Sequence, residues 1–323
     1  MSPFVRPWLP LLFALSCISA SWADATLFVQ EPYGLFGDIN PTGHASVYLS
    51  RVCADSPVVL RRCDRGELGI VISRYRKVSG YDWIAIPLAP YLYAVEDFAR
   101  VPEEANLETV VALREEYRRR HLRNIVPDGP DGRTPAGSWV ELVGAAYNRK
   151  IYGFQIQTTE AQDDHLISVL NSHTNKSHFN LFFNNCADFS RRILNLYYPG
   201  AIRRNYISDG GITTPQQIAR CLTSLAKHHP DLPLSTFFLP QILGSRSPSR
   251  RIEGVSEGFI RSKKYILPLA ALHPWVAGAI LTVYVVHGRF NVAQHAETQF
   301  GPFELSVIHD SVPSRWEEVA QGR

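Results

Sequence analysis

Two apolar runs, one near each end of the sequence, limit the globular part of this 323-residue chain to the segment between them. The first run covers residues 8–18 and is followed by Ser21 and Ala23, small residues three and one positions before a cut after Ala23. This is the pattern of a secretory signal peptide, so we expect residues 1–23 to be removed on export. Two alternatives stay open: a lipoprotein cut before Cys17, and an uncleaved anchor helix, which would still place the domain outside the cytoplasm.

The second apolar run, residues 265–286, contains no charged residue and is long enough to span a bilayer of about 30 Å. We expect a transmembrane segment here, joined to the domain by a linker of residues 241–264 and followed by a tail of residues 287–323. Pro268 and Pro274 interrupt the run, and more basic residues precede it than follow it, which opposes an outside-to-inside crossing. The alternative is a buried helix, or a helix followed by a strand.

The composition of the chain is that of an ordinary globular protein, with 45% hydrophobic and 20% charged residues. Lys and Arg number 33 against 30 Asp and Glu, and a net charge of only +3 gives no basis for nucleic-acid binding. We find neither a metal-ligand spacing of His and Cys nor a Gly-rich phosphate loop. The sequence therefore predicts no metal and no cofactor.

Residues 24–240 predict one domain of the α+β class. Alternating or β-branched stretches predict strands, and apolar residues at helical spacing predict helices. The predicted strands are residues 45–52, 68–75, 83–93, 151–157 and 179–184. The predicted helices are residues 104–123, which end in a solvated basic run at 118–121, residues 139–148, a helix capped by Thr159 and Gln162, and a helix that starts at Cys186.

The strongest chemical signal is the motif HFNLFFNNCADFSRRILN, in which Cys186 directly follows a predicted strand. Asn185 is a favourable N-cap, so Cys186 lies in the first turn of a helix. Backbone N–H groups and the helix dipole stabilise a thiolate at this position and lower the pKa of the cysteine. The same N–H groups can bind an oxyanion. Asp188, in the same turn, would oppose a thiolate if its side chain pointed inward.

His44 is the candidate general base for this thiol. It follows Gly43, which permits a tight backbone entry, and it opens the alternating segment GHASVYL at the mouth of a predicted strand. A Cys at a helix N-terminus that faces a His at a strand end is the arrangement of papain-like enzymes, here with His before Cys in the chain. The alternative for His44 is a histidine with no catalytic role that is hydrogen-bonded at a strand end.

The segments GHASVYL and HFNLFFNNCADFSRRILN together resemble the permuted branch of the papain-like, NlpC-type superfamily, to which lecithin-retinol acyltransferase-like proteins belong. They are most similar to the N-terminal periplasmic domain of Lnb-type lipoprotein N-acyltransferases, whose cysteine motif reads aromatic-aromatic-Asp-Asn-Cys. The likeness covers roughly residues 28–206. It implies a circularly permuted papain-like fold, with an antiparallel sheet packed against the cysteine-bearing helix.

The resemblance also implies a site that attacks an acyl carbonyl, with Cys186 as nucleophile and His44 as base and later as acid. A third polar group, on the strand paired with that of His44, would hold the imidazole. Ser73 and Glu67 are the candidates, and we include Ser73 in the predicted site. Register, which the sequence alone does not supply, decides between them.

The implied function is that of an extracytoplasmic, membrane-associated thiol acyltransferase or hydrolase. Its expected substrate is a lipid or lipoprotein acyl group, and its expected location is the periplasm, after secretion across the inner membrane. Two alternatives remain: an NlpC-type amidase or endopeptidase that cleaves peptidoglycan peptides, and a catalytically inactive binding module.

The four cysteines that follow the signal segment allow two disulfides in an oxidising compartment. Cys53 and Cys63 flank a predicted hairpin connection, so we expect them to pair. A Cys186–Cys221 disulfide then remains as the structural alternative to a catalytic thiol. Because Cys221 lies on the apolar stripe of a predicted helix, we expect it to be an inert core cysteine instead.

Overall fold

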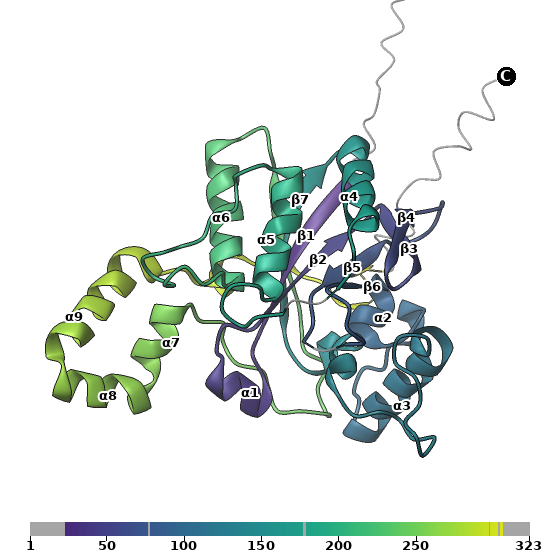
Figure 1. The fold of residues 1–323 in the computed structure, drawn as a ribbon, viewed down its shortest axis with the longest axis horizontal. Coiled ribbons are helices and arrows are strands. Elements are labelled where there is room, and N and C mark those ends of the chain that lie inside the picture. The colour runs from purple at the N-terminus through teal and green to yellow at the C-terminus, as the bar shows by residue number, and fades with distance from the viewer. Residues whose placement is uncertain (1–22, 77, 177–178, 297, 303, 306–323) are drawn as a thin grey trace, which may run out of the picture.

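The computed structural model describes residues 23–305, except residues 77, 177–178, 297 and 303. These residues form a seven-stranded sheet in the order β6-β5-β2-β1-β7-β8-β9, with helices on both faces (Figure 1). The α+β class is confirmed, but the sheet is mixed rather than wholly antiparallel because β9 runs parallel to β8. The signal segment predicted at residues 1–23 lies outside the described residues except for Ala23.

The strands of the sheet are short, and most are buried on both faces. They are β1 (Ala23–Gln30), β2 (His44–Leu49), β5 (Ile70–Ser73), β6 (Ile84–Pro87), β7 (Ile151–Thr158), β8 (Leu234–Leu239) and β9 (Thr298–Gln299).

The central strand, β1, fixes the position of β2. Leu27 and Val29 pack into the core on one face of the sheet, and Phe28 packs into the core on the other face. The antiparallel register between the two strands places Gln30 opposite His44. Because β1 is also paired with β7 along its whole length, it gives the start of β2 a rigid support.

Helices cover both faces of the sheet (Figure 1). The face that carries Leu27 and Val29 is covered by α4 (Glu160–Ser172), α5 (Cys186–Tyr197) and α6 (Pro215–His228). The opposite face is covered by α2 (Leu88–Tyr93), α3 (Leu107–Tyr117) and short turns at Phe98–Arg100, Ser138–Glu141 and Ala145–Tyr147. The capping box of Thr159 and Gln162 that the sequence predicts at the start of α4 is confirmed.

A separate hairpin, β3 (Val52–Ser56) and β4 (Val59–Arg62), carries the disulfide predicted between Cys53 and Cys63, with an S–S distance of 2.05 Å. Asn171 of α4 fastens this hairpin to the domain, because its amide group bonds both the N–H and the carbonyl of Leu60, at 2.9 and 2.8 Å.

Three predicted elements differ from the structure in their extent. The strand predicted at residues 83–93 ends at Pro87, and the chain continues as α2. The basic run that ends the third helix is not fully solvated, because Arg118 is buried between Glu115 and Asp128, at 2.7 and 2.6 Å. The helix predicted at residues 139–148 is two short turns, separated at Gly144, where φ is +71°.

The strand predicted at residues 179–184 is wrong. The segment forms a turn in which the backbones of Asn180 and Asn184 bond each other, at 3.1 and 3.2 Å. Leu181, Phe182 and Phe183 are exposed on this turn instead of alternating between core and solvent. The apolar side chains at residues 181–183 therefore form part of the exposed surface of a turn and not the buried face of a strand.

The second apolar run lies in a bent arm of three helices that projects from the domain (Figure 1). The arm consists of α7 (Val255–Arg261), which precedes the run, and of α8 (Lys263–Leu272) and α9 (Pro274–Val283), which continues into a wider turn at Tyr284–Gly288. Residues 265–286 are not one helix, because the chain breaks at His273, before Pro274. The helical stretch that is long and apolar enough to cross a membrane is Pro274–His295 instead.

The segment that precedes the arm, predicted as a linker, lies against the domain. Ser249 donates a hydrogen bond to the carboxylate of Glu31 at 2.6 Å, and Ser245 donates to the carbonyl of Tyr147 at 3.0 Å. The N–H of Arg250 bonds the carbonyl of Pro32 at 2.9 Å. These contacts fix the point from which the arm projects, next to α1 (Gly34–Ile39).

Candidate functional site

The first turn of α5 holds Cys186 in a defined position. Asn185 is the N-cap, and its side chain accepts a hydrogen bond from the N–H of Asp188 at 2.9 Å, while Asp188 accepts from the N–H of Asn185 at 3.4 Å. This reciprocal capping satisfies two backbone donors at the helix start. Cys186 follows as the first helical residue, partly exposed, with Ala187 and Phe189 buried behind it.

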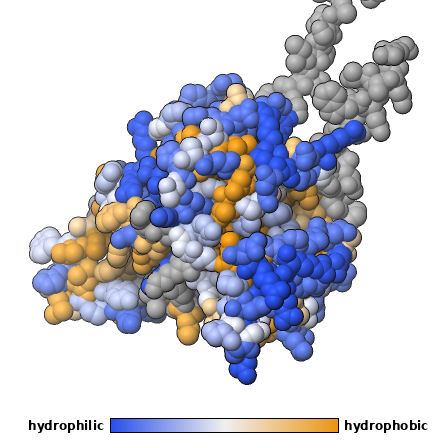
Figure 2. Space-filling view, turned by 45° about the vertical axis from the view of Figure 1, so that its right-hand side comes forward, coloured by the Kyte–Doolittle hydropathy of each residue, from blue (hydrophilic) through white to orange (hydrophobic). Residues whose placement is uncertain are grey.

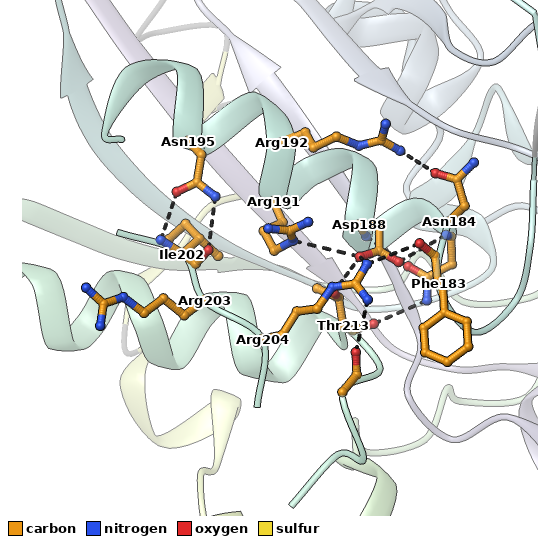
Figure 3. Close-up of polar contacts among 12 residues, drawn as sticks. Phe183, Asn184, Asp188, Arg191, Arg192, Asn195, Ile202, Arg203, Arg204 and Thr213 are labelled. Carbon is orange, nitrogen blue, oxygen red and sulfur yellow. Dashed lines mark hydrogen bonds and ion pairs between the residues drawn. The ribbon is translucent and has the colours of Figure 1, made fainter. Parts of the chain in front are cut away.

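The carboxylate of Asp188 is engaged by Thr213 and Arg204 (Figure 3), and it is not among the groups that shift the pKa of Cys186. Its Oδ1 accepts hydrogen bonds from Thr213 and Arg204, both at 2.6 Å. Arg204 also donates to the carbonyl of Phe183 at 3.1 Å, which ties the exposed turn before Cys186 to the same carboxylate. Asp188 is therefore a buried structural anchor of the helix start.

His44 opens β2, and the backbone before it requires glycine. Gly43 has a φ of +74°, and a Cβ there would lie 2.1 Å from the carbonyl oxygen of Gln30. The imidazole of His44 stacks on the ring of Tyr75, with the ring centroids 5.3 Å apart. The close approach of Gly43 to β1 thus sets the direction in which the chain enters the sheet at His44. The ring of Tyr75 then supports the imidazole.

Ser73 lies on β5, beside β2, and contacts the imidazole of His44. Its hydroxyl oxygen is 3.1 Å from Nε2 of His44 and donates its proton to the carbonyl of Ala45 at 2.8 Å. Since the hydroxyl has one proton, Nε2 of His44 must be the donor in their hydrogen bond. Nδ1 of His44 is then the ring nitrogen that can accept a proton.

The other candidate for the third position, Glu67, lies elsewhere. Its carboxylate is ion-paired with Arg61 at 2.6 Å on the exposed hairpin side of the molecule. The register of β5 with β2 decides between the two, because it brings Ser73 and not Glu67 to the end of the strand that carries His44.

Ala45 links the three predicted site residues. Its N–H lowers the pKa of Cys186, and its carbonyl accepts a hydrogen bond from Ser73, which in turn contacts His44. Cys186 and His44 also line the same cavity. The structure therefore brings Cys186, His44 and Ser73 together from α5, β2 and β5.

Burial keeps the thiol and the imidazole neutral. Burial raises the pKa of Cys186, against the N–H groups of Ala45 and Ala187 and the charge of Arg149, which lower it. Burial and the charge of Arg149 lower the pKa of His44 to about 3. The thiolate expected from the helix position alone is thus outweighed by desolvation. The pair is a neutral thiol beside a neutral base.

The cavity in front of Cys186 has a volume of about 1120 Å³. Its wall includes exposed apolar side chains on the turn before Cys186 and on the arm, among them Leu181, Phe182 and Tyr265. Val255 and Phe259 of α7 also line it, so the arm forms part of the cavity wall. Figure 2 shows apolar surface gathered over the arm, at the left of the molecule.

Sequence reasoning missed a polar cluster in this cavity. Arg149 is paired with Glu141 at 2.5 Å, and Tyr33 donates a hydrogen bond to the same carboxylate at 2.7 Å. Burial would raise the pKa of Glu141, but the charge of Arg149 and the bond from Tyr33 hold it below its ordinary value. These residues come from three separate segments without regular patterning, so no local signal identifies them.

Within the described part of the chain, the two cysteines outside the disulfide, Cys186 and Cys221, are free thiols. Cys221 is partly exposed on α6, where its sulfur contacts the amide of Gln217 at 3.3 Å. The alternative Cys186–Cys221 disulfide is thus not formed. Cys221 packs against the core from its edge and is only partly buried. Among the described residues, one cluster has the geometry of possible metal ligands: Cys53, Cys63 and Glu67. The sulfurs of Cys53 and Cys63 are joined in the disulfide, so they are not free to bind a metal.

The chain was compared with known proteins in three ways. No family model matches it, and searches of curated proteins and of solved structures found no similar protein. The likeness to the permuted papain-like superfamily therefore rests on the two motifs that carry His44 and Cys186.

Proposed function

We propose that this protein is a membrane-associated, extracytoplasmic thiol acyltransferase or hydrolase of the permuted papain-like type. The observation that carries the proposal is that Cys186 and His44 line one cavity and that the imidazole of His44 contacts Ser73, whose hydroxyl also bonds the carbonyl of Ala45. A thiol at a helix N-terminus, a base on a neighbouring strand and a third group that orients the base are the parts that thiol acyl chemistry needs.

The order of His44 before Cys186, on a strand and a helix that pack together, supports the permuted form of the papain-like fold. In the proposed reaction the thiol proton moves to Nδ1 of His44 as the sulfur attacks the acyl carbon. The N–H groups around Cys186 stabilise the oxyanion, and the leaving group takes the proton from His44 as its bond to the acyl carbon breaks. An amine or water then releases the acyl group from the thioester.

The cavity wall favours an acyl chain as the substrate. Apolar side chains of the turn before Cys186 and of the arm face the same space as the thiol. A bilayer is the surface that matches the outer side of the arm, where Trp275 is 89% exposed. Lys263 and Lys264, at the start of α8, suit anionic headgroups beside this apolar surface.

The test is intact-mass labelling of unreduced protein with a fatty-acyl thioester. We expect one acyl adduct at Cys186 that disappears in Cys186→Ala and forms at least about 100-fold more slowly in His44→Ala. Cys221→Ala is the matched control and should label as the wild type does. Acylation of Cys221 instead, or labelling that does not depend on His44, would refute the proposal. Cleavage of purified peptidoglycan without detergent would favour the amidase.

A further inference from the structure

The end of β5 carries three consecutive residues that contact different parts of the proposed site. The hydroxyl oxygen of Ser73 lies 3.1 Å from Nε2 of His44, and Tyr75 stacks on the same imidazole, with the ring centroids 5.3 Å apart. Arg74, between them, donates a hydrogen bond to the side-chain oxygen of Asn184 at 2.6 Å. Successive residues of an extended strand face opposite sides of a sheet. One short segment therefore holds the base and also reaches the chain that leads to the nucleophile.

Asn184 ends the turn before the cysteine-bearing helix, two residues before Cys186. The backbones of Asn184 and Asn180 bond each other at 3.1 and 3.2 Å, which closes the turn. Asn185 follows as the N-cap of α5. The bond from Arg74 therefore fixes the start of α5 relative to β5.

The guanidinium of Arg74 is held by a carboxylate and by an aromatic ring. Arg74 is 1% exposed and is ion-paired with Asp82. Its guanidinium lies 5.3 Å from the ring centroid of Phe189, a buried residue of α5. The N–H of Asp82 donates to the amide oxygen of Asn175 at 2.7 Å, which fixes the partner of the arginine in turn. A planar guanidinium held in this way gives its remaining N–H groups a defined direction.

A second arginine reaches the same oxygen of Asn184, but from α5 itself. Arg192 is exposed and donates to Oδ1 of Asn184 (Figure 3). Because Arg192 lies on α5, this bond joins the helix to the turn that precedes it. Of the two guanidinium groups on Asn184, that of Arg74 is the one that connects the turn to the strand beside His44.

The proposed catalytic pair does not align itself by charge. Burial raises the pKa of Cys186 and lowers that of His44 to about 3, so the thiol and the imidazole are both neutral. A thiolate and an imidazolium would attract each other, whereas a neutral thiol is a weak hydrogen-bond donor. The distance between the sulfur and the ring therefore depends on how firmly the elements that carry them, α5 and β2, are joined.

We propose that Arg74 is a positioning residue, which aligns the thiol of Cys186 with the imidazole of His44 through its bond to Asn184. The inference rests on the proposed function and goes beyond it, because Arg74 takes no proton and forms no covalent bond in the reaction. It sets the distance across which the thiol proton moves to His44. A displacement of about 1 Å between reacting groups lowers a rate about 100-fold. Loss of this bond should therefore be visible in the rate of acylation.

Asn184→Ala tests the bond and leaves Arg74 paired with Asp82. We expect acylation of Cys186 by a short thioester to slow about 10- to 100-fold, because alignment affects the reaction step. The half-saturating concentration of the thioester should stay unchanged. Asn184→Asp should restore most of the rate, since a carboxylate accepts from Arg74 at least as well as an amide does. An unchanged rate in Asn184→Ala would overturn the proposal.

Arg192→Gln is the matched control. It removes the other guanidinium from the same oxygen and leaves the connection to β5 in place. The variant should be acylated at a rate within about two-fold of the wild type, as expected for loss of an exposed charge. An equal loss of rate in Arg192→Gln and in Asn184→Ala would refute the role given to Arg74.

The arginine itself is tested in a variant that leaves no unpaired carboxylate. Arg74→Met is combined with Asp82→Asn, so that both charges of the buried ion pair are removed together. We expect acylation to slow as much as in Asn184→Ala. Adding Asn184→Ala to this variant should cause little further loss, because both changes act on one bond. Fully additive losses would contradict the proposal.

A cycle with His44→Ala separates positioning from a merely structural role. In that background, Asn184→Ala should not slow acylation further, because no base remains to be aligned. Alkylation of Cys186 by iodoacetamide depends on the thiolate and should be equal in Asn184→Ala and the wild type. A further loss in the His44→Ala background, or slower alkylation, would show that Asn184 supports the fold of the turn instead.

The same rates separate this inference from the proposed function. If Cys186 of the wild type is not acylated, or if His44→Ala is acylated as fast as the wild type, the proposed function fails and this inference fails with it. If acylation depends on His44 but not on Asn184, the inference fails alone.

Discussion

At the scale of single residues, the site depends on a balance between helix position and burial. The start of α5 favours a thiolate at Cys186, but burial raises the pKa of the thiol and lowers that of His44 to about 3. The resting pair is therefore neutral, and Ser73, which is also neutral, offers no charge to stabilise an imidazolium. In the proposed reaction, proton transfer would therefore accompany the attack of the thiol and not precede it.

This balance predicts the pH dependence of alkylation at Cys186. The reactive form is the thiolate, so the rate with iodoacetamide should rise with pH and reach its midpoint above about 8.5, the value of an ordinary cysteine. Because the pKa of His44 is lowered to about 3, its titration should add no inflection between pH 5 and 8. A rate that is high and constant from pH 5 to 8 would instead indicate a thiolate–imidazolium pair.

Ser73 should act by positioning His44. In Ser73→Ala, the Nε2–H of His44 and the carbonyl of Ala45 each lose a hydrogen-bond partner. An unsatisfied buried group costs about 1–3 kcal/mol. We therefore expect kcat/KM with a short thioester to fall about 10-fold. Ser190→Ala is the matched control, because its buried hydroxyl has no hydrogen-bond partner among the described residues. Equal losses in both variants would exclude a specific role for Ser73.

At the scale of elements, the close approach of two strands decides where His44 lies. Gly43 lies against the carbonyl of Gln30 at the end of β1, has a positive φ, and leaves no room for a Cβ. β2 begins at the next residue. On the other side of the site, the capping of α5 by Asn185 and Asp188 fixes the first turn that carries Cys186. The catalytic pair proposed here thus depends on a strand start and a helix start, each set by its own backbone constraint.

Gly43→Ala tests the first of these constraints. The left-handed backbone alone costs about 1–2 kcal/mol for a residue with a Cβ. The contact with the carbonyl of Gln30 adds to that cost, so we expect a loss of more than about 2 kcal/mol in urea unfolding. Gly66→Ala is the control, since Gly66 has a φ of +85° but open space around it. If Gly43→Ala loses no more free energy of unfolding than Gly66→Ala, β1 shifts to accommodate the added Cβ.

At the scale of the whole molecule, the arm joins the cavity to an exposed apolar surface (Figure 2). α7 and the start of α8 line the cavity, while Trp275 and Leu272 at the bend between α8 and α9 are exposed. α8 has ten residues, about 15 Å of helix, and is too short to span a bilayer alone. α9 begins the stretch Pro274–His295, which is long and apolar enough to do so. An arm that rests on lipid would bring the cavity mouth to the membrane surface.

The bend of the arm should therefore contribute to lipid binding. In co-sedimentation with phosphatidylglycerol vesicles, we expect Trp275→Ser to weaken binding about 10-fold, because the indole no longer leaves water. Val111→Ser removes a side chain of 54% exposure from α3, on the body of the domain, and should bind as the wild type does. An unchanged affinity in Trp275→Ser would show that this bend does not enter the bilayer.

The sequence by itself determined the features that local interactions set. The start of α5 at Cys186, the capping box of α4 and the Cys53–Cys63 pairing each involve residues close in the chain. Helix capping and short-loop closure depend little on the rest of the fold, so local patterns predict them. The α+β class followed from the same patterns, because each long element carries its own period.

The tertiary structure alone decided the features that depend on distant partners. Register chose Ser73 over Glu67, and three separate segments met to form the cluster of Arg149, Glu141 and Tyr33. The turn before Cys186 displays its aromatic residues outward, although their alternation predicts a strand. Strand register and the placement of exposed apolar side chains arise from contacts across the whole chain, which no local pattern contains.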